Sequence, residues 1–234
     1  KEYGSIVAAD DLDFARIYRR VDEIEQQNCE NLFDLAYQKD TLKKLLPLIK
    51  QAEIMAGKYE IVATNPPYLS KMDKKLKNYV TKHYHDFSGD LFSVFMYRNF
   101  DFCKQGGYCA FMSPFVWMFI KTYEKLRGYI IQNKSISSLI QMEYSAFEEA
   151  TVPICTFVLK NGIESEPGVY LKLSDFKGGM EVQKQKVLEA VENPDCAYRF
   201  ETSIHSFTKL PGIPIAYWGS EKFGEIFEDS PLVA

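Results

Sequence analysis

The sequence predicts an α/β protein that forms half of a doubly wound sheet. Two observations support this fold class. From residue 58 onward, short apolar runs of strand length alternate with segments of helical periodicity, in the order strand, helix, strand, helix, strand, strand. The turns between these segments are short, as they are in compact α/β domains. The 234 residues, 46% of them hydrophobic, are enough to fill one well-packed core.

The predicted elements have recognisable start and stop signals. Asp90 caps the first helix of the half-sheet, because an aspartate side chain accepts the free N–H groups that open a helix. Gly106 and Gly107 turn the chain into the next strand, and Pro114 ends it, since proline donates no ladder hydrogen bond. The predicted strands are 59–64, 108–113, 137–142 and 153–160, and the helices between them are 91–104 and 121–133.

The regions on either side of this half-sheet are of different character. Before it, apolar residues at helical spacing predict amphipathic helices over 10–27 and 32–49, and Pro47 is expected to kink or divide the second. After it the pattern is less regular. It predicts a strand at 168–173, a helix at 181–191, weak alternation at 198–208 and a last helix that begins at Ser220.

The most informative stretch is residues 58–70, KYEIVATNPPYLS. An apolar run typical of a buried parallel strand stops at Asn65-Pro66-Pro67-Tyr68, because two consecutive prolines cannot continue a strand. The tetrapeptide therefore follows the carboxyl end of the strand, where open α/β sheets bind their ligands. By itself, a strand-to-loop turn rich in Asn and Pro is common.

These four residue types together can prepare an amino group for reaction. Asn65 has a side-chain carbonyl, and the prolines hold the backbone stiffly, so that the Pro66 carbonyl can point the same way. Two acceptors aimed at one planar amino group bind its two N–H hydrogens and push its lone pair out of conjugation. The ring of Tyr68 offers a plane on which a base or amide can stack. The motif therefore predicts in-line transfer of a methyl group to an amine.

Asn65-Pro66-Pro67-Tyr68 resembles the catalytic motif of S-adenosylmethionine-dependent amino methyltransferases, above all the adenine-specific DNA methylases. The resemblance extends over most of the chain when the sequence is compared with the large phage-exclusion methylases of the BREX/Pgl type. The similar stretches are Tyr3-Gly4-Ser5, 58–68, 123–127, 156–159 and 211–218. It implies a partial Rossmann-like methyltransferase fold, containing the second half of the sheet with its last strand antiparallel.

The resemblance also implies a function and a division of the chain. We expect a segment of a site-specific DNA N6-adenine methyltransferase from a bacterial restriction-modification or phage-defence system, with S-adenosylmethionine as cofactor and double-stranded DNA as substrate. Phe147 stands where related enzymes place a second aromatic ring that sandwiches the flipped base, although it fits a loop plug equally well. The implied parts are a helical lead-in (1–57), the catalytic half (58–162) and an extension towards a target-recognition domain (163–234).

Charge and composition restrict the other functions. The net charge of −4 does not indicate a nucleic-acid-binding protein. However, a basic run directly follows the motif, and lysines there can hold DNA phosphates or simply form a solvated helix face; the candidates are Lys71, Lys74, Lys75 and Lys77. Three histidines and five cysteines without CxxC spacing predict no metal site and reduced thiols in a cytoplasmic protein. No apolar run reaches membrane-spanning length.

One departure from the family pattern concerns the cofactor. The expected Gly-rich turn after the first strand is missing, because no G-x-G occurs in the sequence. We therefore expect this chain to be a fragment of a longer enzyme, with the cofactor motif before Lys1 and the target-recognition domain near or beyond Ala234. On its own the fragment should bind S-adenosylmethionine weakly or not at all, and be inactive.

Two alternatives remain open from the sequence. The same tetrapeptide occurs in glutamine methylases that act on release factors, and related motifs occur in some RNA methylases, so the acceptor could be protein or RNA. Alternatively, a degenerate methylase half could serve as a DNA-binding or assembly module alongside other subunits of a defence complex. The basic run and the long tail after Lys160 weakly favour nucleic acid as the substrate.

Overall fold

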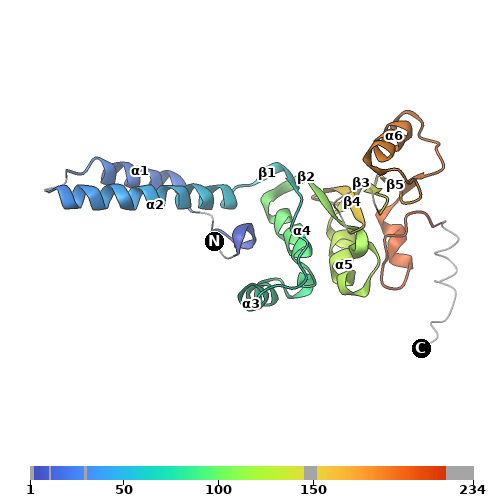
Figure 1. The fold of residues 1–234 in the computed structure, drawn as a ribbon, viewed down its shortest axis with the longest axis horizontal. Helices are drawn as coiled ribbons and strands as arrows, with labels where there is room; N and C mark the ends of the chain where they lie inside the picture. The colour runs from blue at the N-terminus through green and yellow to red at the C-terminus, as the bar shows by residue number, and fades with distance from the viewer. Residues whose placement is uncertain (1–2, 11, 29–30, 145–151, 220–234) are drawn as a thin grey trace. The chain divides into compact units, whose positions relative to one another are not determined.

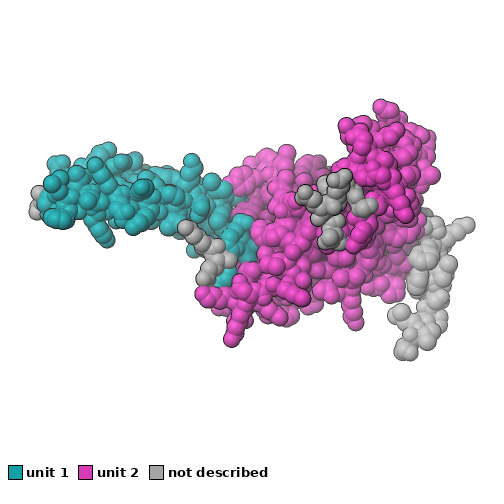
Figure 2. Space-filling model, in the orientation of Figure 1, with its two compact units in different colours: residues 1–58 teal, residues 59–234 magenta. Residues whose placement is uncertain are grey.

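The structure is a computed structural model that describes residues 3–10, 12–28, 31–144 and 152–219. It consists of two compact units, residues 1–58 and 59–234, which are coloured separately in Figure 2. Each unit has its own secondary structure and is described by itself.

The first unit is a pair of helices, α1 (Phe14–Glu25) and α2 (Leu32–Ala56), after a short 3-10 helix, η1 (Gly4–Ile6). The two helices lie side by side (Figure 1). The Tyr18 hydroxyl of α1 donates to Glu53 of α2 at 2.8 Å. Pro47 lies inside α2, so the expected division of this helix does not occur. Pro47 is exposed, and its missing N–H removes one hydrogen bond from a helix that continues on both sides of it.

The second unit is built on a six-stranded sheet. Its spatial order is β1-β2-β4-β3-β5-β6. Four strands run in one direction, whereas β4 and β6 run in the opposite direction. The strands are β1 (Tyr59–Thr64), β2 (Cys103–Pro114), β3 (Ser135–Gln141), β4 (Ile154–Lys160), β5 (Gly168–Lys172) and β6 (Arg199–Thr202).

The antiparallel strand β4 confirms the predicted half-sheet. It follows β3 in sequence but inserts between β2 and β3, so that Phe157 lies opposite Phe111 on one side and Leu139 on the other. The strand predicted at 168–173 is β5, which adds to the far side of β3. The sheet therefore continues past the predicted half-sheet to β6.

Helices cover both faces of the sheet. On one face, α4 (Leu91–Phe102) and α5 (Glu124–Asn133) bury Phe92, Met96 and Leu126 in the main core. On the other face, α6 (Gly179–Glu192) packs Ala190 near Leu171 of β5. The remaining helices are α3 (Lys74–His83) and the 3-10 helices η2 (His85–Phe87), η3 (Phe115–Met118), η4 (Lys121–Tyr123) and η5 (Ile204–Lys209).

The junction between β1 and β2 explains why β2 starts earlier than predicted. Tyr59 pairs with Cys103 and Ile61 pairs with Tyr108, so the intervening residues of β2 form an irregular bulge. At Gly107 a Cβ atom would lie 2.5 Å from the Glu60 carbonyl oxygen, which only glycine avoids. The two glycines that were expected to precede the strand are therefore inside it.

Strand β1 is at the edge of the described sheet, and its second face is uncovered. Ile61 is 69% exposed and Tyr108 of the neighbouring strand is 40% exposed. The opposite face is packed, because Val62 contacts the main core. Parallel strands are normally buried on both faces. The exposed side of β1 and β2 is therefore an unusual surface for a parallel pair.

Candidate functional site

The motif loop begins where β1 ends, at Thr64. Asn65 is exposed, whereas Pro66 is buried. Next to them, the ends of β1 and β2 line an open, shallow depression of about 400 Å³, formed by residues 63–65 of β1 and its loop and residues 110–112 of β2. This is the carboxyl edge of the parallel pair, as expected from the sequence.

The hydroxyl of Tyr68 joins the two walls of this depression. It lies 3.0 Å from Oδ1 of Asn65 and 3.3 Å from the backbone carbonyl oxygen of Met112. The ring of Tyr68 is half-buried against the main core and stands edge-on to the ring of Phe92, with 6.4 Å between the ring centroids. The motif tyrosine therefore contacts the motif asparagine directly, a relationship that the sequence did not predict.

A buried carboxylate fixes the loop just after Tyr68. One oxygen of Asp90 accepts the N–H groups of Leu69 at 2.8 Å and of Phe92 at 3.1 Å. In return, the N–H of Leu91 donates to the carbonyl oxygen of Leu69 at 3.1 Å. The predicted cap of α4 is confirmed, but Asp90 also anchors the motif loop. No sequence signal identifies this second role, because it depends on tertiary proximity.

Burial sets the protonation states of this region. Desolvation raises the pKa of Tyr68, with a smaller contribution from Cys155, so its hydroxyl stays a proton donor at neutral pH. Desolvation likewise raises the pKa of Asp90, and the N–H groups of Phe92 and Leu69 counteract this effect. The loop is thus held by neutral donors and one carboxylate shielded from solvent.

The four predicted phosphate-binding lysines are exposed. Lys71 precedes α3, whereas Lys74, Lys75 and Lys77 lie in its first turns. Asp73 caps this helix by accepting the N–H groups of Lys75 and Leu76. Phe147, the predicted second stacking residue, lies outside the described residues.

Neither metal-binding nor membrane features are found in the part of the chain that the structure describes. Within these residues, no three His, Cys, Asp or Glu side chains are grouped so that they could hold a metal ion. None of the described helices is both long and apolar enough to cross a bilayer. Of the predicted reduced cysteines, Cys103, Cys109 and Cys155 are buried free thiols.

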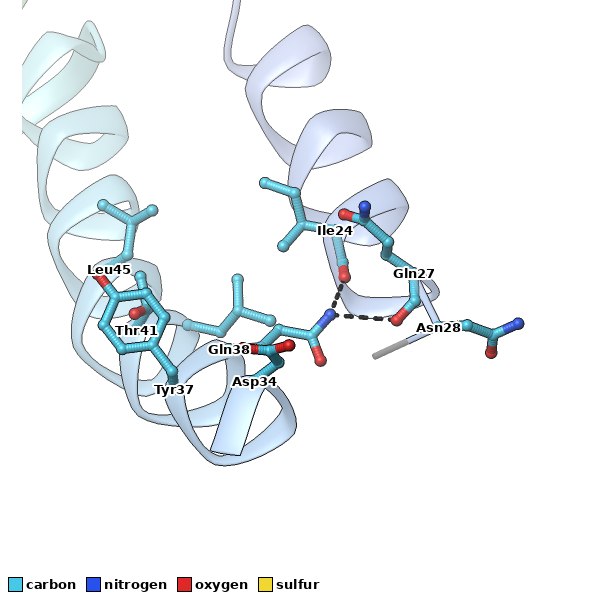
Figure 3. A pocket seen from close by; sticks show the side chains of 9 residues that line it. Ile24, Gln27, Asn28, Asp34, Tyr37, Gln38, Thr41 and Leu45 are labelled. Atoms are coloured by element: carbon cyan, nitrogen blue, oxygen red, sulfur yellow. Dashed lines mark hydrogen bonds between the residues drawn. The ribbon is translucent and has the colours of Figure 1, made fainter. Parts of the chain in front are cut away.

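A second cavity, of about 440 Å³, lies between the end of α1 and the start of α2 (Figure 3). The side chain of Gln38 points towards the carbonyl oxygens of Ile24 and Gln27 at the end of α1, and its Nε2 donates to both. The other lining side chains include Tyr37, Leu45 and the carboxylate of Asp34. This arrangement holds the helix pair together and brings no nucleophile and base into contact.

Comparisons with known proteins identify a family and two curated relatives of this chain. Residues 9–147, more than half of the chain, match the family described as "Eco57I restriction-modification methylase". The chain is 32% identical over 236 residues to the adenine-specific methyltransferase PglX of Lacticaseibacillus casei. This alignment covers 98% of this chain and 20% of PglX. It is also 31% identical over 217 residues to the adenine-specific methyltransferase BrxX of Escherichia coli, in an alignment that covers 87% of this chain and 17% of BrxX.

A solved structure shows the same fold at lower sequence identity. The methyltransferase subunit of a type I restriction-modification system from Streptococcus thermophilus superimposes with a TM-score of 0.51. The match is 16% identical and covers 65% of this chain and 36% of that subunit. The chain spans about one fifth of the length of the curated relatives.

Proposed function

Because the chain belongs to the Eco57I restriction-modification methylase family, we propose that it forms the amine-binding side of a DNA N6-adenine methyltransferase. The observation that carries the proposal is the position of Asn65. Asn65 is exposed at the carboxyl end of β1, beside the open depression. Its side-chain oxygen accepts a hydrogen bond from the hydroxyl of Tyr68, the aromatic residue of the same motif. The full-length enzyme would act on double-stranded DNA in the cytoplasm, as part of a restriction-modification or phage-defence system.

The roles of the motif residues follow from the chemistry of the amine. A paired adenine hides its amino group, so the base must be flipped out of the duplex, at a cost of a few kcal/mol. Stacking on Tyr68 offsets roughly 1–3 kcal/mol of this cost. Asn65 and the Pro66 carbonyl accept the two amine hydrogens and orient the lone pair, while Pro67 keeps the loop stiff. The amine loses a proton after methyl transfer, so that a strong general base is not required.

Two further roles concern DNA binding. Phe147 would cover the second face of the flipped base, as in the resemblance to adenine methylases. Lys71, Lys74, Lys75 and Lys77 would contact phosphates, since their exposed ammonium groups follow the motif loop directly. Other subunits of a defence system are proposed as protein partners.

The described residues fit the acceptor side of the reaction but not a complete cofactor site. S-adenosylmethionine supplies the methyl group, and a Gly-rich turn that would hold it is missing from the sequence. The uncovered face and free edge of β1 are consistent with a sheet that continues in the full-length protein. We propose that the cofactor-binding strands lie in the part of the relatives that this chain does not span.

Both curated relatives are adenine-specific methyltransferases, which favours adenine over glutamine or RNA as the acceptor. The intact Asn-Pro-Pro-Tyr motif at the sheet edge likewise favours catalysis over a purely structural module. The test is Asn65→Ala in the full-length protein. We expect methylation of a duplex containing the target site to fall about 10²- to 10³-fold, because one acceptor of the developing charge is lost.

Asn78→Ala is the matched control, since Asn78 is an exposed asparagine on α3, outside the motif. It should methylate DNA at the wild-type rate. If Asn65→Ala folds, as judged by its thermal unfolding, and retains full activity, the catalytic assignment is wrong.

A further inference from the structure

The hydroxyl of Tyr68 donates to the Asn65 oxygen that the target amine needs, and so takes one of the two lone pairs of that oxygen. A phenol has a single proton, yet the hydroxyl has two acceptors within reach, Asn65 Oδ1 at 3.0 Å and the Met112 carbonyl at 3.3 Å. The bond to Asn65 is the shorter of the two. In this state the motif asparagine is thus already bound to a donor from its own loop.

We propose that the Tyr68 hydroxyl is a placeholder for the target amine, which leaves Asn65 and turns to the Met112 carbonyl when the base enters. This inference rests on the proposed function and deepens it. It makes the amino group a requirement for complete binding, since a base without that group cannot replace the hydroxyl on Asn65. Tyr68 then selects the class of base in addition to stacking on it.

The exchange requires little movement. Met112 is already within hydrogen-bonding distance, so rotation of the O–H bond is sufficient and the ring can stay in place. The ring is held edge-on to Phe92, and the following residue, Leu69, is anchored to Asp90. Both walls of the depression take part, because Asn65 and Met112 line it from β1 and β2. Burial keeps the hydroxyl protonated and therefore a donor in both positions.

The placeholder makes a specific prediction about base discrimination. In the wild-type enzyme, an incoming adenine gains its bond to Asn65 but exchanges a shorter hydroxyl bond for a longer one. A purine without the amino group leaves the hydroxyl where it is. Removing the hydroxyl should therefore strengthen adenine binding and leave purine binding unchanged. A neutral hydrogen bond contributes on the order of 1 kcal/mol, or about fivefold in affinity, so a partial exchange predicts roughly two- to fivefold.

The experiment uses the full-length enzyme and its Tyr68→Phe variant. Binding is measured for two duplexes that carry adenine or unsubstituted purine at the target position. The ratio of adenine to purine affinity should rise about two- to fivefold in Tyr68→Phe, through adenine alone. A ratio that stays the same or falls would overturn the proposal, because the hydroxyl would then orient Asn65 instead of competing for it.

Two controls keep the result interpretable. In an Asn65→Ala background, the change Tyr68→Phe should leave the ratio unaltered, since no acceptor remains to be contested. Tyr37→Phe, at an exposed tyrosine on α2, should leave both affinities unaltered. Thermal unfolding of each variant checks its fold. Failure of wild-type enzyme to methylate the adenine duplex would instead refute the proposed function.

Discussion

The carboxylate of Asp90 accepts the backbone N–H of Leu69 at 2.8 Å, although the two residues belong to different elements. The same oxygen caps α4 through Phe92. One buried side chain therefore connects the position of the motif loop to the start of the helix that fills the main core. The fold holds the reactive loop through its backbone, and the loop side chains remain available for binding.

Replacing this anchor should affect both stability and activity. Asp90→Ala leaves two N–H groups without their acceptor, and we expect a loss of about 1–3 kcal/mol in unfolding free energy. Asp90→Asn keeps an acceptor oxygen and should lose less. In the full-length enzyme, Asp90→Ala should lower kcat by a larger factor than it changes the KM for DNA, because a displaced loop misaligns the amine. Urea unfolding and steady-state kinetics measure the two effects.

The pH dependence of Asp90 has an unusual sign. Burial raises its pKa above the usual 3.8, so protonation of Asp90 is more favourable in the folded than in the unfolded state. The resulting stabilisation is complete below pH 3.8 and is lost as the pH rises through the folded pKa. Compared with Asp90→Asn, wild-type protein should therefore lose stability from about pH 4 upward, as measured by urea unfolding at a series of pH values. An opposite slope would show that the N–H groups outweigh desolvation.

Substitution of the buried Arg127 should strongly reduce the free energy of unfolding. Arg127 is 1% exposed, and burial lowers its pKa. Its guanidinium donates to the carbonyl oxygens of Trp117, Ile120, Gly212 and Ile213. Arg127→Met would remove the guanidinium donor from all four carbonyl oxygens, although the Ile120 oxygen keeps the N–H of Tyr123 at 3.2 Å, and should cost about 3–5 kcal/mol of unfolding free energy. Arg19→Met, at an exposed arginine of α1, should change it by less than about 0.5 kcal/mol. If urea unfolding gave the same loss of unfolding free energy for Arg127→Met and Arg19→Met, the stabilising role of the Arg127 hydrogen bonds would be refuted.

The exposed lysines around the start of α3 predict a salt effect. If Lys71, Lys74, Lys75 and Lys77 each neutralise a phosphate, their joint replacement by alanine should reduce the slope of log affinity against log salt by about 3–4. Titrations of full-length protein with duplex DNA at several salt concentrations measure this slope. The same number of exposed lysines on α2 provides the matched control: Lys39, Lys43, Lys44 and Lys50. An equal reduction in the control would mean that α3 has no special role.

Within the described residues, local sequence signals predicted the order of the strands and of the helices between them correctly, and they failed where distant residues decide. The helix expected from Ser220 onward lies outside the described residues. Strand β1 was placed at residues 59–64, as observed, because proline ends it unambiguously. The start of β2 was missed, since its bulge depends on the approach of Gly107 to Glu60 in another strand. Of the two effects expected of Pro47, a kink or a division, the division does not occur, since α2 continues through Pro47 to Ala56.

The candidate site shows the same division. The motif and the acceptor role of Asn65 follow from residue types alone, and they remain predictions. The bond between Tyr68 and Asn65 does not follow from them, because a tyrosine near an asparagine in sequence has many available rotamers. The second acceptor, Met112, is contributed by a strand far along the chain and is a backbone atom, which no side-chain pattern reveals.

The bare side of β1 has a practical consequence for work with this chain. Ile61 is 69% exposed on a strand at the margin of the described sheet, and such a strand is a template onto which another chain can add. Purified by itself, the chain should tend to self-associate through this margin. A charged residue in place of Ile61 would act as a gatekeeper against such aggregation, without disturbing the packed side of the strand.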